Sequence, residues 1–112
     1  MAYDEELADR VRAAVDGAGL VEEKRMFGGL SFLVDGRLAV AASGRGGLLV
    51  PVGAGHRDAL LAEPHVEPMV MGGRESRSWV HVLADGVRTD AQLQAWVDRG
   101  VATVRSPDPP GP

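Results

Sequence analysis

Closely spaced turn signals between residues 21 and 52 restrict the fold of this 112-residue chain more than any other feature. The dipeptide Asp35-Gly36 lies between two apolar segments and favours the two-residue type I′ turn of a β-hairpin. Residues 43–47 supply the next turn, which precedes the apolar run at 48–52. Turns this short join only antiparallel neighbours, because a parallel connection needs a dozen or more residues. The segment is therefore predicted to be a meander of three or four strands.

Amphipathic patterns predict helices near both ends of the chain. Asp4 is an N-cap candidate for a helix over residues 4–16, in which apolar residues recur at i, i+4, i+7 and i+8. Thr89 and Gln92 have the spacing of a capping box and open a helix that continues to Arg105. Gly100 lies inside this second helix. Glycine there costs about 1 kcal/mol relative to Ala, unless a neighbouring element needs the close approach.

The middle of the chain adds a shorter helix and two more strands. The helix is predicted over residues 56–62, and Pro64 ends it. Pro68 limits residues 66–71 to an edge strand or an irregular strand, and residues 78–83 form another strand. The order is thus helix, three or four strands, helix, two strands, helix. This order favours an α+β two-layer sandwich, in which an antiparallel sheet of about five strands has flanking helices.

The glycine and proline content raises the question of disorder. The chain contains 15 Gly and 7 Pro, about a fifth of its residues. Most of the glycines fall at predicted turns, whereas the segment after Arg105 holds four of the prolines. We therefore expect one domain over residues 1–106 and a disordered Pro-rich tail over residues 107–112.

Composition argues against several classes of function. The chain has no Cys, so it has no disulfide, no thiolate zinc site and no cysteine nucleophile. It has no apolar run long enough to cross a membrane, and its acidic start does not resemble a secretory signal, so a cytoplasmic location is expected. The spacing of its three histidines fits no compact metal motif, and its serines have no nucleophile setting. We expect no metal, no cofactor and no enzyme activity.

The charge pattern suggests a second possible role. The formal net charge is -4, yet residues 24–57 hold five bases and one acid. Nucleic-acid binding would use these bases, which are Lys24, Arg25, Arg37, Arg45 and Arg57, although the acidic total argues against it. The glycine-rich turn at 44–47 and the segment 72–74 could cradle a small anion with their backbone amides. A plain hairpin turn explains the same glycines at 44–47.

Two further segments combine glycines with large apolar side chains. Met26-Phe27-Gly28-Gly29 suits a bulge or a sharp bend, where the glycines permit a positive φ or a close backbone approach. Residues 69–74 have similar ingredients. Trp79 and Trp96 are interpreted as core anchors, whereas an exposed tryptophan would indicate an interface.

These segments together resemble the amino-terminal domain of the TfoX/Sxy family. The resemblance covers residues 2–106 and is carried by AYDEELADRVR, MFGGLSFLVDGRLAVAASGRGGLLVPV, PMVMGGRESRSWVHV and TDAQLQAWVDRGVATVRS. Its most specific parts are residues 26–29, the Gly46-Gly47-Leu48 tripeptide, and the pairing of Gly73-Arg74 with Trp79.

The resemblance implies a secretion-chaperone-like α+β fold and a regulatory role. Named members of the family regulate natural competence in bacteria, act with the cyclic-AMP receptor protein at promoters, and carry a second, carboxy-terminal domain. This chain resembles a stand-alone copy of the amino-terminal domain. The implied function is a non-enzymatic regulatory or protein-interaction module, cytoplasmic, with a protein partner or a second copy of itself.

The resemblance also suggests an interaction surface, whereas it supplies no catalytic residues. The surface residues that we predict are Met26, Phe27, Gly28, Gly29, Arg74 and Trp79. Nucleic-acid binding through the basic segment and binding of a small anion or ligand remain the alternatives.

Overall fold

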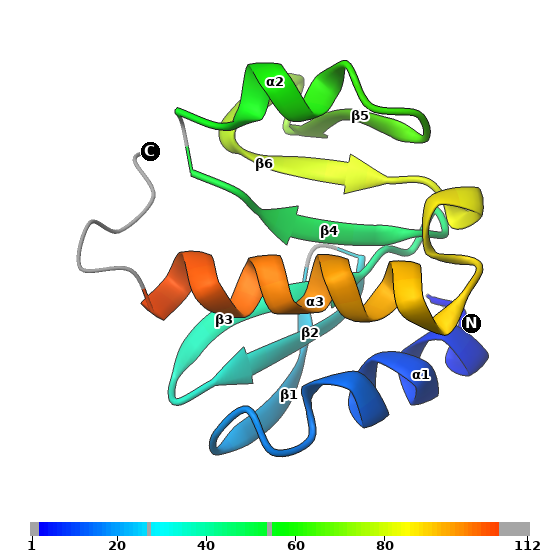
Figure 1. The fold of residues 1–112 in the computed structure, drawn as a ribbon, viewed down its shortest axis with the longest axis vertical. Helices are drawn as coiled ribbons and strands as arrows, with labels where there is room; N and C mark the ends of the chain where they lie inside the picture. Colours follow the sequence, from blue (N-terminus) through cyan, green and yellow to red (C-terminus); the bar gives the residue numbers. More distant parts are fainter. Residues whose placement is uncertain (1–2, 27, 54, 106–112) are drawn as a thin grey trace.

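A computed structural model describes residues 3–26, 28–53 and 55–105 of the chain. The predicted tail at 107–112 lies outside the described residues. In chain order the elements are α1 (Glu5–Val15), β1 (Val21–Met26), β2 (Gly29–Val34), β3 (Arg37–Ala42), β4 (Leu48–Pro51), α2 (Arg57–Leu61), β5 (Val66–Met71), β6 (Arg74–Val82), the short 3-10 helix η1 (Ala84–Val87) and α3 (Asp90–Arg105) (Figure 1).

The strands form one antiparallel sheet in the order β1-β2-β3-β4-β6-β5. The prediction of an α+β fold is confirmed. The sheet has six strands rather than about five, because the charged segment from Val21 to Met26 forms an edge strand of its own. Its residues are almost all exposed, so no apolar alternation marks it in the sequence. β5 occupies the other edge, as Pro68 indicates, and its pairing with β6 is irregular between Pro68 and Val70.

The local signals in the sequence act as expected. Asp35 and Gly36 have φ values of 52° and 83°, which are the two positive values that a type I′ turn requires. At the start of α3, the Thr89 backbone N–H donates to Gln92 Oε1 at 2.9 Å, and the Gln92 N–H donates to Thr89 Oγ1 at 3.1 Å. The Asp4 carboxylate caps α1 by accepting the N–H of Glu6 at 2.9 Å. The predictions of the Asp35-Gly36 turn, the Asp4 N-cap and the Thr89–Gln92 capping box are confirmed.

The main core lies between the sheet and the helices α1 and α3, which cover the same face (Figure 1). Alternate residues of the central strands point into it, among them Phe32, Val40 and Val80, which are fully buried. The short helix α2 adds Leu60 to the same core. The opposite side of the sheet, which we call the open face, carries a separate small cluster of Ala41, Leu49, Met69 and Trp79.

The close approach of α3 to β3 explains the glycine inside that helix. A Cβ atom at Gly100 would lie 2.3 Å from the carbonyl oxygen of Ala39. Glycine is therefore needed at this position because α3 and β3 lie too close together for a side chain.

We expect Gly100→Ala to destabilise the fold, although helix propensity alone would favour Ala by about 1 kcal/mol. The added methyl group must push α3 away from β3, where α3 makes its main packing contacts with the sheet. Urea denaturation followed by circular dichroism measures the change. The exposed Ala102→Gly in the same helix is the control, because it changes helix propensity alone. A stabilised Gly100→Ala variant would contradict this reading of the α3–β3 contact.

Candidate functional site

Three glycine-rich connections that are far apart in the sequence meet around one cavity on the open face. The cavity has a volume of about 450 Å³. Its rim includes Gly28 from the β1–β2 connection, residues 43–45 from the β3–β4 turn, and Gly72 from the β5–β6 turn. Its floor and walls include Leu49, Met69 and His81. We call this site the turn cavity.

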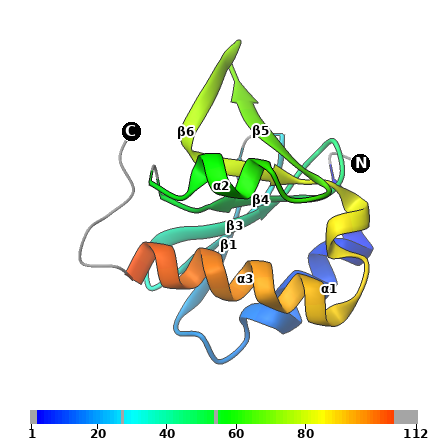
Figure 2. The same cartoon turned by 45° about the horizontal axis from the view of Figure 1, so that its top comes forward.

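The β5–β6 hairpin makes the cavity possible. This hairpin bends away from the helix layer (Figure 2). The bend follows the irregular pairing between Pro68 and Val70, and both of these residues line the cavity. The sequence feature that weakens β5 as a regular strand therefore helps to shape the site.

Glycines are required where the turns approach other strands. Gly28 has a φ of 72°, which side-chain-bearing residues rarely adopt. A Cβ atom at the next residue, Gly29, would lie 2.0 Å from the carbonyl oxygen of Ala42. Both of the proposed reasons for glycines at this bend, a positive φ and a close approach, are thus present at adjacent positions.

The floor of the cavity is apolar. Leu49 and Met69 are buried and pack with Ala41, while the half-buried Trp79 packs against the same cluster. Val70, in the cavity wall, exposes 54% of its surface, which is unusual for a large aliphatic side chain. The cavity therefore offers apolar contacts to a ligand in a part of the molecule that lies outside the main core.

His81, in β6, contacts both β5 and the β3–β4 turn at the cavity. The Nε2 atom of His81 lies 2.7 Å from the carbonyl oxygen of Gly46, and its Nδ1 atom lies 3.1 Å from a carboxylate oxygen of Glu67. Each ring nitrogen of His81 therefore has a polar neighbour within the protein. His81 is buried and its polar atoms are satisfied within the protein, so its role is to hold β5, β6 and the β3–β4 turn in place.

Arg45 brings a positive charge to the rim. Its side chain is exposed, and its backbone N–H donates to Ser43 Oγ at 3.1 Å, which stabilises the turn. Among the described residues, no carboxylate lies within ion-pair distance of its guanidinium. The cavity thus has an apolar floor, a wall in which His81 contacts Glu67, and the Arg45 guanidinium at its rim.

Comparison with known families assigns the chain. The model of the TfoX N-terminal domain matches residues 13–104, which include every residue that lines the turn cavity. The chain belongs to the TfoX N-terminal domain family. A search of curated proteins and a search of solved structures gave no match.

This TfoX N-terminal domain brings together part of the predicted interaction surface. Gly28 lines the turn cavity, and Trp79 packs against its floor. Met26 ends β1 with 36% of its surface exposed, and Arg74 is exposed at the start of β6, but neither lines the cavity. Gly29 is buried. Phe27 falls outside the described residues.

The five bases proposed for nucleic-acid binding occupy separate places in the TfoX N-terminal domain. Lys24 and Arg25 belong to the edge strand β1, and Arg45 lies at the cavity. Arg37, at the other end of β3, donates to the carbonyl oxygen of Val104 in α3. Arg57, in α2, pairs with Asp58 at 3.0 Å and with Glu75 at 2.6 Å. They do not form one patch, and nucleic-acid binding through them stays a prediction.

The described residues contain no cluster of side chains suited to hold a metal ion. In the same part of the chain, no helix is both long and apolar enough to cross a membrane. His81 and Glu67 were missed as a pair by sequence reasoning, because their contact depends on the register between β5 and β6 rather than on their spacing.

Proposed function

We propose that this TfoX N-terminal domain is a non-enzymatic interaction module with a regulatory role, and that the turn cavity binds a short segment of a partner protein. The observation that carries the proposal is the Arg45 guanidinium, which has no ion-pair partner among the described residues, at the rim of a cavity with an apolar floor. Family membership supports a regulatory or interaction role in general terms. The cavity suggests where the contact is made.

The lining of the cavity suggests the chemistry of that segment. Its volume falls in the range of about 300–1,000 Å³ that is usual for ligand sites and can hold one or two side chains of a peptide. Leu49, Met69 and Val70 favour an apolar side chain, and methionine adapts to differently shaped partners. Glu67 and Arg45 are the two charged residues of the lining. Glu67 lies 3.1 Å from His81, whereas Arg45 has no ion-pair partner among the described residues, so Arg45 is the charge that we expect a ligand to pair with. A peptide with an apolar residue next to Asp or Glu would fit the apolar lining and also pair with Arg45.

A displayed library of random peptides tests this proposal. We expect selected peptides to share an apolar residue next to an acidic one, and we expect Arg45→Glu to weaken their binding by tenfold or more, about 1.4 kcal/mol, since a charge attraction becomes a repulsion. Val70→Asp should have a similar effect by placing a carboxylate in the cavity wall. Arg99→Glu is the matched control, because it makes the same charge change at an exposed position of α3, a helix that packs on the other face of the sheet.

The alternatives give different results in the same assay. Peptides without an acidic residue, bound equally well by the wild type and by Arg45→Glu, would contradict the proposal. Titration with inorganic phosphate distinguishes a small-anion site, which would bind phosphate alone in an Arg45-dependent manner. Retention of DNA or RNA at low salt would instead favour the nucleic-acid alternative, because phosphate contacts are strongest there.

A further inference from the structure

We propose that the edge strand β1 pairs antiparallel with β1 of a second copy of this chain, in a register centred on Glu23, and so joins two six-stranded sheets into one. This surface differs from the turn cavity, and the proposal does not depend on the proposed function. The evidence is the direction of the backbone groups along the edge, the pattern of side chains on its two sides, and two exposed apolar residues at its ends.

The backbone of β1 has hydrogen-bonding groups that point away from the sheet. The Asp35 N–H donates to the carbonyl oxygen of Leu20 at 2.8 Å, so Leu20 faces the neighbouring strand β2. In an antiparallel pair, the backbone N–H and C=O groups of successive residues point alternately toward the partner strand and away from it. The backbone groups of Val21, Glu23 and Arg25 therefore point away from β2, toward the free edge. β1 is at the edge of the sheet, and all its residues after Val21 are exposed. These outward groups are in position to pair with another strand.

Geometry limits how two copies of this edge can pair. Two copies of one strand that pair antiparallel are related by a twofold axis perpendicular to the sheet. Two residues can lie opposite each other only if the backbone groups of both point toward the other copy or those of both point away from it. When the axis passes through Glu23, each Glu23 lies opposite the Glu23 of the other copy, and each Val21 lies opposite an Arg25. All of these residues point outward, so each opposed pair exchanges two backbone hydrogen bonds.

The side chains on the open face complement one another in this register. Lys24 is paired in the sheet with Ser31, and Glu22 with Leu33, so both of their side chains lie on the open face. In the dimer, each Glu22 lies opposite a Lys24 of the other copy, at the closely spaced positions of the ladder. Each Leu20 lies opposite a Met26. These two side chains expose 72% and 36% of their surfaces in the single chain, and the pairing would cover them.

The one like-charge contact is relieved within each copy. On the helix side, the two Glu23 carboxylates face each other across the axis. Arg12 of α1 binds Glu23 through two nitrogens, with Nη2 lying 2.8 Å from Oε1. These hydrogen bonds hold the pKa of Glu23 below its usual value, which shows that the guanidinium favours the charged carboxylate. Each Arg12 therefore compensates its own Glu23 at the centre of the interface.

The neighbouring allowed register is poorer. When the axis passes through Lys24, each Glu23 lies opposite an Arg25, but Glu23 is already bound by Arg12 of its own chain. Each Lys24 then lies opposite another Lys24, and each Glu22 lies opposite a Met26. Neither lysine has an ion-pair partner among the described residues to relieve this contact. Charged residues on an edge strand usually prevent association with other strands. The register centred on Glu23 is preferred because Arg12 compensates its one like-charge contact and because it places the exposed Leu20 opposite the exposed Met26.

Charge exchange across the interface tests the proposal by sedimentation equilibrium over roughly 1 µM to 500 µM, a range suited to a small interface. We expect the wild-type chain to form a dimer. Glu22→Lys should weaken it by tenfold or more, because both Glu22–Lys24 pairs become like-charge pairs. The double variant with Glu22→Lys and Lys24→Glu has the same composition as the wild type and should restore the dimer to within about threefold. Glu63→Lys, on an exposed site near α2, is the control.

A backbone variant separates this interface from a general charge effect. Arg25→Pro removes an outward N–H that the isolated sheet does not use, so the thermal melting of the single chain should change little while the dimer is lost. A wild-type chain that remains a monomer throughout the range overturns the proposal. The same conclusion follows if Glu22→Lys dimerises like the wild type, or if the double variant fails to restore the dimer while its circular dichroism matches that of the wild type.

Discussion

Gly47→Ala is expected to lower the free energy of unfolding by about 3–5 kcal/mol. Gly47 has a φ of 75°, a conformation that costs a residue with a Cβ atom about 1–2 kcal/mol. Its Cβ would also lie 2.1 Å from the carbonyl oxygen of Val82, where the β3–β4 turn lies beside the end of β6. Relief of the clash requires movement of backbone rather than of a side chain. Thermal or urea unfolding measures the loss.

The adjacent glycine gives a matched control for this prediction. Gly46 has a φ of 88°, but a Cβ atom there would have no neighbour within 4 Å. Gly46→Ala should therefore cost only the conformational part, about 1–2 kcal/mol. Equal losses for the two variants would show that the close approach to Val82 is unimportant. We also expect Gly47→Ala to weaken peptide binding in the folded fraction, because the carbonyl of Gly46 holds His81 in the cavity wall.

Phe32→Ala is expected to cost about 3–5 kcal/mol of stability, because it leaves a large void in the main core. Phe32 is the largest side chain that is completely buried, and it points from β2 toward the helices. Among the described residues, the fully buried members of this core other than Phe32 are aliphatic, mostly Val and Leu. The loss corresponds to a decrease in melting temperature of roughly 12–20 °C for a domain of this size.

The next residue of β2 distinguishes the two faces of the sheet. Leu33 points to the open face and is only half-buried, so Leu33→Ala should cost about 1–2 kcal/mol. Calorimetry of both variants under the same conditions gives the comparison. If the two losses were equal, the open face would contribute as much to stability as the helix-covered face, which would contradict the division of the core described above.

The fold was predictable where a structural signal is local. The Asp35-Gly36 turn, the Asp4 cap and the Thr89–Gln92 capping box each involve residues within three positions of one another, and side-chain chemistry determines them. The number of strands was less predictable. Residues 21–26 owe their strand structure to pairing with β2, and charged side chains are acceptable there because the strand lies at an edge.

The candidate site was predictable only in parts. The sequence draws attention to the glycines near residues 28, 44 and 72 one segment at a time. Their convergence depends on the order of the strands, which places β6 between β4 and β5, and on the bend of the β5–β6 hairpin. The contact between His81 and Glu67 depends on the same pairing. Neither strand order nor hairpin curvature leaves a short-range pattern in a single sequence.

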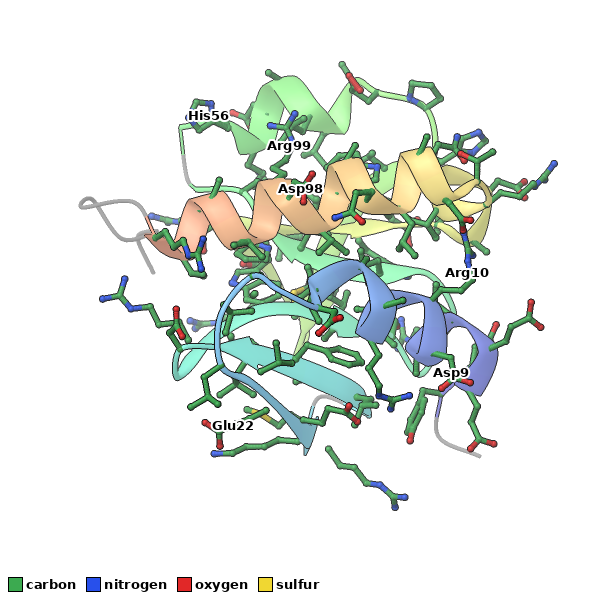
Figure 3. All side chains as sticks on the ribbon, turned by 60° about the horizontal axis from the view of Figure 1, so that its bottom comes forward. Asp9, Arg10, Glu22, His56, Asp98 and Arg99 are labelled. Atoms are coloured by element: carbon green, nitrogen blue, oxygen red, sulfur yellow. The ribbon has the colours of Figure 1, made fainter. Side chains whose placement is uncertain are left out.

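The placement of charged side chains around the helices has a related explanation. Figure 3 shows Asp9 on α1 and Asp98 and Arg99 on α3, which are exposed, and Arg10, which extends from α1 toward α3. Arg10 reaches Asp90 of α3 at 3.4 Å, and Arg99 lies 5.5 Å from the centre of the Trp96 ring. Such exposed contacts contribute little to stability. They make the outer side of the helix layer polar, whereas exposed apolar side chains such as Val70 lie on the open face.

The separation of the two apolar clusters has a consequence for how this domain can diversify. The cluster of Ala41, Leu49, Met69 and Trp79 shares no member with the larger core beneath α1 and α3. Substitutions in this cluster therefore affect only a small part of the apolar surface that is buried in the domain. Substitutions in this small cluster should therefore reshape the turn cavity at a lower cost in stability than substitutions in the main core.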